Sequence, residues 1–512
     1  MLDNLPPEIV LDAILPLLPP RDILAIGRVS KSLHLLISDT LIWKRKLTDS
    51  SNYIALRILT QSHHNLDWQH IYRRALSPHL YVWGEATNGR LGIDFRDPRI
   101  KRGNCVPQPI RVDVGVDLVQ IVAGGWSYHG LGRNGDVVFW GEYNGDMVPF
   151  GNVDYRNPGA RASRPMRLNL PFKVVDMSAG RAHVLFLSDT GDVYQSICCA
   201  LPHRITHPCL ENDDIYQINA AWTHSAIFMK SGTIMIFWSY DCLHSEEYRL
   251  GHGSGPRQLL SEHDGTSINT HTFDYTPDAA ILPRISDETI TQMANAEDAI
   301  LALTESGRLY RMGLSGSRGL RGAERAQELR RMFASGEKQW VELSNFSPDN
   351  LQKLLPEGAT LSHLSHITTS YRQFALYAPA IQHSVVFAGD ATRNDAAPEL
   401  IKVDDVVDVA RGDHHSIALT RRGEVRAWGS PKNGKLGVPT IDYTRDSAVT
   451  EPLPVPFSDD RRVFVFSIAS AGWQNAALVI DLDGDDEEQD GEHKKEGQES
   501  NDNCECSLFS KI

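Results

Sequence analysis

The densest group of side chains that could bind a metal lies in the segment CCALPHRITHPC, which spans residues 198–209. Cysteine thiolates and histidine imidazoles are the usual ligands of structural zinc. The adjacent cysteines and the spacing of the histidines do not match a common zinc site. We therefore interpret these side chains as buried thiols and loop histidines, and we expect no metal. The candidate ligands are Cys198, Cys199, His203, His207 and Cys209.

The acidic run DLDGDDEEQDGE, residues 481–492, has the aspartate spacing of a calcium-binding loop at Asp481, Asp483 and Asp485. Such a loop needs a glycine at its sixth position, where this sequence has Asp486. Acidic and polar segments rarely bury enough apolar surface to fold. The sequence predicts a disordered acidic tail over residues 483–512.

We recognise no catalytic motif in the sequence. No Ser-His-Asp set can be nominated. The segment GHGSG, residues 251–255, lacks the preceding strand and the following helix that a phosphate-binding loop requires. The cysteines of the terminal CECSLFSKI lie too far from its end for prenylation. We expect a non-catalytic binding protein without a cofactor.

The charge of the chain is unevenly distributed. The formal net charge at pH 7 is -14. Residues 481–505 contribute about -10 of this charge, which leaves about -4 for the rest of the chain. A nucleic-acid-binding protein normally has an excess of basic side chains. We therefore expect no direct contact with DNA or RNA.

Cysteine content and the apolar N-terminal segment both bear on the compartment. The chain has 7 cysteines, an odd and low number for a disulfide framework. The apolar segment from Leu2 to Leu33 is interrupted by Glu8, Asp12 and several prolines, unlike a signal peptide or a membrane span. We expect a soluble protein of the cytoplasm or nucleus.

The chain contains internal repeats. The segment DVARGDHHSIALTRRGEVRAWG, which begins at Asp408, matches DMSAGRAHVLFLSDTGDVY, which begins at Asp176. Weaker copies begin at Gln120, Gln217, Met293, His366 and Ser467, which makes seven in all. The residues that define the repeat are Gly124, Gly180, His183, Gly191, His224, Gly412, His415, Gly423, Trp428 and Gly429.

Each repeat is interpreted as a small antiparallel sheet. Two short apolar runs flank a tight turn such as TRRG, in which Gly423 can adopt a positive φ. The copies recur at the spacing of propeller blades rather than of helical solenoids. The segment from Leu80 to Gly92 has no first half, and the segment from Ser467 to Leu482 has no second half, so we expect the two to pair and close the ring.

This pattern resembles the regulator-of-chromosome-condensation repeat, whose units form a seven-bladed β-propeller. The resemblance covers residues 80–482. It is weak in the units at Met293 and His366, where Ala296 and Thr369 take the glycine position and Ala299 and Arg372 the histidine position.

Two insertions enlarge this weaker region. One runs from Ser254 to Pro283, and the other from Ser315 to Gly358. The second contains GAERAQELRRMFASG, which predicts a short helix ending near Gly336. Long loops on a rigid ring often carry binding function, although loops also tolerate insertions without function.

The N-terminal segment predicts a pair of short helices. Pro6 and Pro7 suit a first helical turn, and Ile9, Val10, Ala13, Ile14 and Leu17 then fall on one face at helical spacing. Pro19 and Pro20 stop this helix, and Asp22 begins another. About 40 residues cannot bury this many apolar side chains internally, so the surface calls for a partner.

The order LPPEI, LPPRDIL, RVSKSL and LIWKRKL resembles the F-box, a helical module that docks on a Skp-type adaptor in cullin-RING ubiquitin ligases. The resemblance implies an F-box over residues 1–47 and a helical connector over residues 48–79, with NLDWQHIYRRAL as its core. The alternative is that these helices only cap the propeller. The implied adaptor-binding set is Leu5, Pro6, Ile9, Ile14, Leu18, Pro19, Leu24 and Val29, with Trp43 packing the last helix.

Together the two resemblances point to the fungal F-box proteins with this propeller, of the SCF-associated factor type. They imply a substrate-recognition subunit of a Skp-cullin-F-box ubiquitin ligase that binds an unidentified protein for degradation. One alternative is a guanine-nucleotide exchange factor for a Ran-like GTPase, with the helices as an accessory. Another is a scaffold that uses its F-box for purposes other than degradation.

Overall fold

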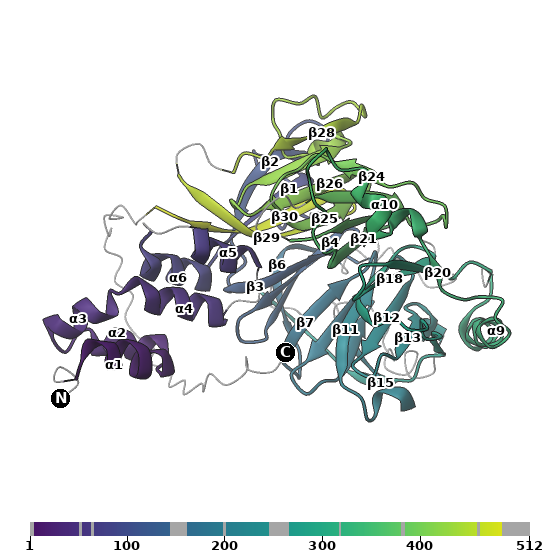
Figure 1. Cartoon of the computed structure of the whole chain (residues 1–512), viewed down its shortest axis with the longest axis horizontal. Coiled ribbons are helices and arrows are strands. Elements are labelled where there is room, and N and C mark those ends of the chain that lie inside the picture. Colours follow the sequence, from purple (N-terminus) through teal and green to yellow (C-terminus); the bar gives the residue numbers. More distant parts are fainter. Residues whose placement is uncertain are drawn as a thin grey trace.

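The computed structural model describes residues 5–50, 54–62, 66–143, 161–197, 201–244, 266–316, 319–379, 385–457 and 461–483. Helices from the first part of the chain project from a ring of sheets (Figure 1). The described strands form seven sheets, each with its own set of neighbouring strands. The fold class expected from the sequence, a seven-bladed β-propeller preceded by a small helical module, is confirmed.

The helical part begins with a proline-capped turn. Pro7 occupies the first turn of its helix, where its missing N–H costs nothing. The second helix starts at Pro20 rather than at the expected Asp22, because Pro19 is already extended. The helices are α1 (Pro7–Ile9), continued by turns at Val10–Ile14 and Leu15–Leu17, α2 (Pro20–Ile26), α3 (Lys31–Ile37), α4 (Thr40–Ser50), α5 (Ile54–Ser62) and α6 (Trp68–Leu76).

Six blades follow one another along the chain. The first three consist of β3 (Leu118–Ala123), β4 (Ser127–Gly132), β5 (Val137–Glu142) and β6 (Arg161–Asn169); β7 (Val174–Ala179), β8 (Val184–Ser188), β9 (Val193–Ser196) and β10 (His203–Ile205); and β11 (Ile215–Ala220), β12 (His224–Met229), β13 (Ile234–Trp238) and β16 (Ala280–Ile281). The next three consist of β17 (Ile290–Asn295), β18 (Ala299–Thr304), β19 (Leu309–Gly313) and β20 (Val341–Glu342); β21 (His366–Ser370), β22 (Gln373–Tyr377), β23 (Val386–Asp390) and β24 (Glu399–Ile401); and β25 (Val406–Gly412), β26 (His415–Thr420), β27 (Val425–Gly429) and β28 (Val449–Pro454).

The seventh blade joins strands from the two ends of the propeller. It contains β29 (Val463–Ala471), β30 (Gln474–Asp481), β1 (His79–Glu85) and β2 (Cys105–Val112). β1 pairs antiparallel with β30, from His79 opposite Val479 to Gly84 opposite Gln474. This pairing removes two open sheet edges that would otherwise be exposed.

The two insertions take different structures. The first supplies β14 (Ser267–Asn269) and β15 (Phe273–Tyr275), which pair in parallel with the outer strands β6 and β10 and so cover the edges of two earlier blades. The second contains α9 (Gly322–Ala334), which ends where Gly336 adopts a positive φ, as the sequence predicts, and α10 (Pro348–Gln352).

The glycine and histidine that begin each repeat lie in a recurring turn between the first two strands of the blade, as at Gly180 and His183. The Gly180 N–H donates to the His183 carbonyl, at 2.9 Å. A Cβ on Gly180 would collide with the carbonyl of Ala221 in the next blade, so only glycine permits this approach. Gly191 and Gly423 have positive φ in the following hairpin turns, and Gly429 has a positive φ at the end of the third strand, β27.

In the repeat that begins at His366, the structure corrects the positions assigned from the sequence. Ser370 pairs with Gln373 as Gly412 pairs with His415 in the next blade. The glycine and histidine positions are therefore held by Ser370 and Gln373, not by Thr369 and Arg372. The sequence alignment was wrong by one residue because HITTSYRQFALY contains neither marker residue.

One hydrophobic cluster connects the helices with the propeller. It includes Val10 and Leu15 from the first helical turns, Trp43 from α4, Ile71 from α6 and Leu478 from β30. The helical module is therefore packed onto the closing blade rather than tethered by a free linker. None of the described helices is long and apolar enough to span a membrane.

Candidate protein-binding surfaces

We call residues 5–50, from Leu5 to the end of α4, the N-terminal module. Large exposed apolar side chains are concentrated there, whereas the much longer described part of the propeller exposes few. Surfaces of this kind normally mark an interaction site. The exposed residues of the module are Leu5, Ile9, Leu17, Leu24, Val29, Leu35 and Leu41.

The predicted adaptor-binding residues fall into three groups. Leu5, Ile9, Leu24 and Val29 are exposed by 37 to 73 % of their surface, and Pro6 and Pro19 are exposed as well. Ile14 and Leu18 are half-buried.

Trp43 is the exception to the predicted set. Its side chain is 2 % exposed, its Nε1–H donates to the Ile37 carbonyl at 2.7 Å, and its ring lies 5.4 Å from that of Tyr72. Trp43 therefore packs the last helix against the connector, and its buried ring is not part of the exposed surface.

The expected single apolar face of the first helix is wrong. The chain passes from an α-helical turn to a π-helical turn and then to a 3₁₀ turn between Pro7 and Leu17. Each change of winding rotates the following side chains. As a result Val10 and Leu15 are buried, whereas Leu17 is 82 % exposed.

Three exposed leucines of the module are absent from the predicted set. They are Leu17, Leu35 and Leu41. Helical spacing could have found Leu35, because Leu33 and Ile37 occupy the buried face of α3 and Leu35 falls on its other side. Leu17 carries no such signal, since its exposure depends on the change of winding.

Polar contacts fix the first turns of the module to α4. Arg45 forms an ion pair with Asp12, with Nη1 2.9 Å from Oδ1. Lys46 donates its Nζ to the Pro16 carbonyl at 2.7 Å, and partial burial lowers the pKa of Lys46. These two contacts hold the first turns against α4 while the large apolar side chains of the module stay exposed. The module therefore presents a preformed surface.

The connector helices attach the module to one end of the propeller. α5 contacts β29 and α6 contacts β30. Arg133, in the turn after β4, donates Nη2 to the Leu76 carbonyl at the end of α6, at 3.0 Å. In Figure 1, α1, α2 and α3 extend away from the ring beyond this attachment.

The opposite end of the propeller carries a second candidate surface. We call it the turn face: the seven turns between the first and second strands of the blades, at residues 124–127, 180–183, 221–224, 296–299, 370–373, 412–415 and 471–474. The connector enters at His79, opposite Val479, whereas the turn at 471–474 lies at the other end of β30.

Backbone hydrogen bonds between blades hold the turns together. Gly125 N–H donates to the Arg181 carbonyl at 2.7 Å, and Arg181 N–H donates to the Ala221 carbonyl at 3.1 Å. Asp413 N–H donates to the Gly472 carbonyl at 2.7 Å. The middle residues of the turns are therefore fixed relative to one another around the axis.

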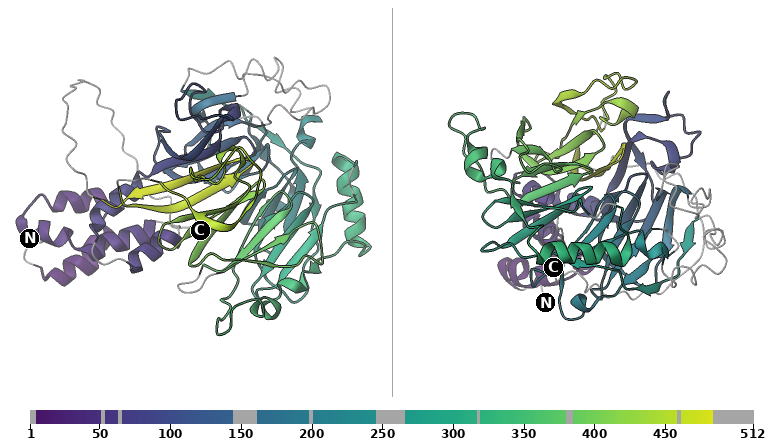
Figure 2. Two further views of the ribbon diagram at one scale, coloured as in Figure 1. Left: turned by 90° about the horizontal axis from the view of Figure 1, so that it is seen from above. Right: turned by 90° about the vertical axis from the view of Figure 1, so that its right-hand side faces the viewer.

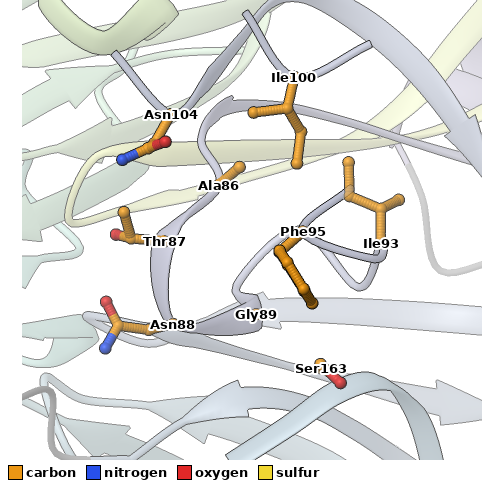
Figure 3. A pocket seen from close by; sticks show the side chains of 9 residues that line it. All are labelled: Ala86, Thr87, Asn88, Gly89, Ile93, Phe95, Ile100, Asn104 and Ser163. Carbon is orange, nitrogen blue, oxygen red and sulfur yellow. The ribbon is translucent and has the colours of Figure 1, made fainter. Parts of the chain in front are cut away.

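A cavity of about 370 Å³ opens beside the turn face. It lies in the segment after β1, where Ile93, Phe95 and Ile100 form an apolar side and Asn88 and Asn104 a polar side (Figure 3). Phe95 is 75 % exposed. An apolar pocket with a few amide groups suits a side chain of a protein partner.

The candidate metal ligands that the structure describes contact other side chains of the chain. His203 accepts from Gln195 Nε2 at 3.0 Å, and His207 Nδ1 contacts Cys209 Sγ at 2.9 Å. Cys198 and Cys199 lie outside the described residues. Within the described ranges, no group of three or more metal-ligating side chains occurs.

The two described carboxylates of the acidic run bind arginines. Asp481 pairs with Arg461 at 2.8 Å and Asp483 with Arg462 at 2.7 Å. Asp485, Asp486 and the acidic tail after residue 483 lie outside the described residues, as does the segment 251–255.

The geometry defines a class: a helical module with an exposed apolar surface, fixed to one end of a seven-bladed propeller. The F-box-like family model matches residues 2–49, and the model of the regulator of chromosome condensation (RCC1) repeat matches residues 406–435. These matches confirm both resemblances found in the sequence, to an F-box and to a propeller with RCC1 repeats.

Relatives match different shares of the chain. F-box protein pof9 of Schizosaccharomyces pombe is 22% identical over 475 residues, which cover 90% of this chain and 86% of that protein. SCF-associated factor 1 of Saccharomyces cerevisiae is 26% identical over 131 residues, or 23% of this chain and 20% of the relative. The human probable E3 ubiquitin-protein ligase HERC3 is 24% identical over 196 residues, which cover 36% of this chain and 18% of HERC3. The match thus spans about a fifth of the last two proteins.

Solved structures agree on the propeller. Prp20p from Saccharomyces cerevisiae superposes with a TM-score of 0.52 at 14% identity, covering 80% of this chain and 93% of Prp20p. Human WBSCR16 gives a TM-score of 0.50 at 18% identity, covering 79% of this chain and 99% of WBSCR16. These similarities show the fold alone.

Proposed function

We propose that this protein is the substrate-recognition subunit of a Skp-cullin-F-box ubiquitin ligase. Its N-terminal module binds a Skp-type adaptor and, through it, a cullin. Its propeller binds the protein that is to be ubiquitinated and degraded. The proposal includes a site of action in the cytoplasm or nucleus and no direct contact with nucleic acid.

The observation that carries this proposal is the exposed apolar surface of the N-terminal module. Val29, Leu35 and Leu41 each expose more than half of their side chains. A cap on the propeller would bury such residues against the blades. The F-box-like match over residues 2–49 supports a Skp-type protein as the partner that covers them.

The mechanism that follows is proximity. Because a single hydrophobic cluster runs from the module to the closing blade, the propeller is held at a fixed position relative to the module. A protein bound to the propeller then presents its lysines to the ubiquitin-charged enzyme at high effective concentration. In this role the chain is a non-catalytic adaptor, since the bond to ubiquitin is formed by other subunits.

The test is affinity purification of the full chain and of a Leu5→Ala, Pro6→Ala, Ile9→Ala variant, with mass spectrometry under proteasome inhibition. We expect the wild type to recover a Skp-type adaptor and a cullin and the variant to lose both. Proteins retained by both forms are the substrate candidates.

A matched control separates this effect from a general loss of apolar surface. Ile281, Val341 and Leu354 are exposed on the propeller by 38, 36 and 43 %. Their triple alanine variant should recover the adaptor as the wild type does. Equal adaptor recovery by the module variant, or recovery of a small GTPase in place of the adaptor by all forms, would contradict the proposal.

A further inference from the structure

The middle residues of the turn face form a patch of aromatic and charged side chains, in which Arg181 and Arg372 lie among Glu297, Asp298 and Asp413. Four of the seven turns contribute an aromatic side chain: Trp126, Trp222, Tyr371 and Trp473. Trp126, Trp222 and Tyr371 are half-buried, and Trp473 is 40 % exposed. Tryptophan, tyrosine and arginine are the residues that most often dominate the energy of protein interfaces.

Arg181 lies at the centre of this patch, between two tryptophans. Its guanidinium carbon is 4.8 Å from the ring centroid of Trp126 and 4.0 Å from that of Trp222. The Trp222 ring in turn lies 4.5 Å from the ring of Tyr371. These contacts with two rings restrict the motion of the guanidinium, so less entropy is lost when it binds an acceptor.

The two arginines of the patch differ in their partners. Arg372 is bound to Glu297, with Nε 2.6 Å from Oε2. In the described part of the chain no carboxylate lies within ion-pair distance of Arg181, and its Nε has neither a hydrogen-bond partner nor accessible surface. The remaining guanidinium nitrogens are therefore available as a donor fork.

Two middle residues of the turn face have a left-handed backbone conformation. Tyr371 and His414, both in middle positions of turns, have φ of 53° and 62°. Left-handed conformations of residues other than glycine cost free energy and cluster at functional sites. The inter-blade hydrogen bonds hold these residues in place before any partner arrives.

We infer that the turn face is the substrate-docking surface of the propeller and that Arg181 binds an acidic side chain of a protein segment laid across the aromatic patch. The planar donor fork matches a carboxylate in two-point geometry. That the bound segment belongs to a substrate rests on the proposed function. The inference adds the face of the propeller and the charge of the bound segment.

The position of the patch agrees with this assignment. The connector enters the propeller at the opposite end from the turns, so the turn face is not covered by the described helices of the module. Helix α9 follows Gly313, which pairs with Ala299 at the turn end. Figures 1 and 2 place α9 and the N-terminal module at opposite ends of the molecule. A protein segment bound to the turn face therefore does not compete with an adaptor bound to the N-terminal module.

The test uses a random-peptide phage library selected on the immobilised full chain. Selected peptides should be enriched in aspartate or glutamate. A synthetic copy should bind at least about tenfold more weakly to Arg181→Gln than to the wild type. Arg204→Gln is the control, because Arg204 pairs with Asp274 on the outer strand β10 of the same blade. This control should bind like the wild type.

A second measurement does not depend on the folding of a variant. Replacing the selected acidic residue of the peptide by its amide should weaken binding to the wild type about as much as Arg181→Gln does. The two changes together should cost little more than either alone. Peptides without acidic enrichment, or an amide form that binds equally well, would overturn the inference. A dimer of the full chain that Arg181→Gln dissociates would also overturn it.

The two proposals fail separately. The Leu5, Pro6 and Ile9 variant should keep peptide binding while losing the adaptor. Intact peptide binding by a wild type that recovers no adaptor would remove the proposed function but leave the acidic-segment site. Normal adaptor recovery with equal peptide affinity of Arg181→Gln would remove only the inference.

Discussion

Five histidines of the propeller are almost completely buried, and burial keeps them neutral. Desolvation lowers the pKa of His129, His183 and His203 to about 3 and that of His224 and His415 to about 4. Their partners are within or between blades, such as Asn475, whose Oδ1 lies 2.9 Å from His415 Nε2. The histidines of the repeat therefore act as structural hydrogen-bonding groups.

This burial predicts acid sensitivity. An unfolded histidine with a pKa of 6.5 binds protons that folded His415, with a pKa of about 4, does not. The contribution of neutral His415 to the stability of the folded protein is complete above pH 6.5 and is lost as the pH falls toward 4. Glutamine stands at the equivalent position of the closing blade, at Gln474. We therefore expect His415→Gln to lower the free energy of unfolding by only about 1 kcal/mol near neutral pH. The variant should lose less stability than the wild type between pH 6.5 and 4 in denaturant unfolding. Parallel decline of both proteins would contradict this.

Glycine positions with positive φ differ in the space around them. A Cβ on Gly429 would lie within 2.7 Å of the His415 Cα, whereas one on Gly191 would meet nothing within 4 Å. We expect Gly429→Ala to destabilise the propeller by about 3 kcal/mol or more and Gly191→Ala by about 1 kcal/mol. Urea unfolding of both variants gives the comparison. Similar values for the two would show that conformation alone, and not the contact, sets the cost.

At the scale of elements, the N-terminal module shows how buried and exposed side chains divide between folding and binding. Trp43 is buried between α4 and α6, and Val29 is 73 % exposed after α2. Both belong to the set implied by the F-box resemblance, yet their environments differ. The contrast supplies a test of which side chains bind the adaptor.

We expect Trp43→Ala to lower the stability of the module by about 3 to 5 kcal/mol, because it leaves a cavity beside Tyr72. Val29→Ala should change stability by less than about 0.5 kcal/mol. It should nevertheless weaken adaptor binding, as measured with purified adaptor by calorimetry. Unchanged affinity of Val29→Ala would remove Val29 from the binding surface.

Elements with local markers were predictable, and elements set by distant contacts were not. The hairpin glycines, the proline-started helix and α9 follow from residues within a few positions of one another. The one-residue shift at Ser370 and the rotation that exposes Leu17 leave no local trace. The parallel pairing of β14 with β6 depends on residues about 100 positions apart. Arg181 was assigned no role because its tryptophans come from two other turns.

For the whole molecule, the connector belongs to the stability of the propeller. α6 packs on β30, and its terminal carbonyl of Leu76 accepts from Arg133. Apolar residues of the closing blade, such as Leu478 and Ile480, share a cluster with Ile71 and Trp68 of α6. The propeller is therefore complete only with these helices in place.

We expect a chain that begins at His79 to unfold at a lower temperature than one that begins at Leu66. The shorter chain exposes the apolar side of the closing blade that α6 covers. Thermal unfolding followed by near-ultraviolet circular dichroism measures the difference, with the full chain as reference. Equal unfolding temperatures would mean that the connector only links the two parts.

The closing pairing of β1 with β30 has a mechanical consequence. β1 lies between β2 and β30, and two residues separate its start at His79 from the end of α6 at Leu76. A pull on the N-terminal helices along this strand acts parallel to it and loads the hydrogen bonds on both sides at once, in shear rather than by unzipping. Force transmitted from an attached complex would therefore meet its strongest resistance where the ring is closed.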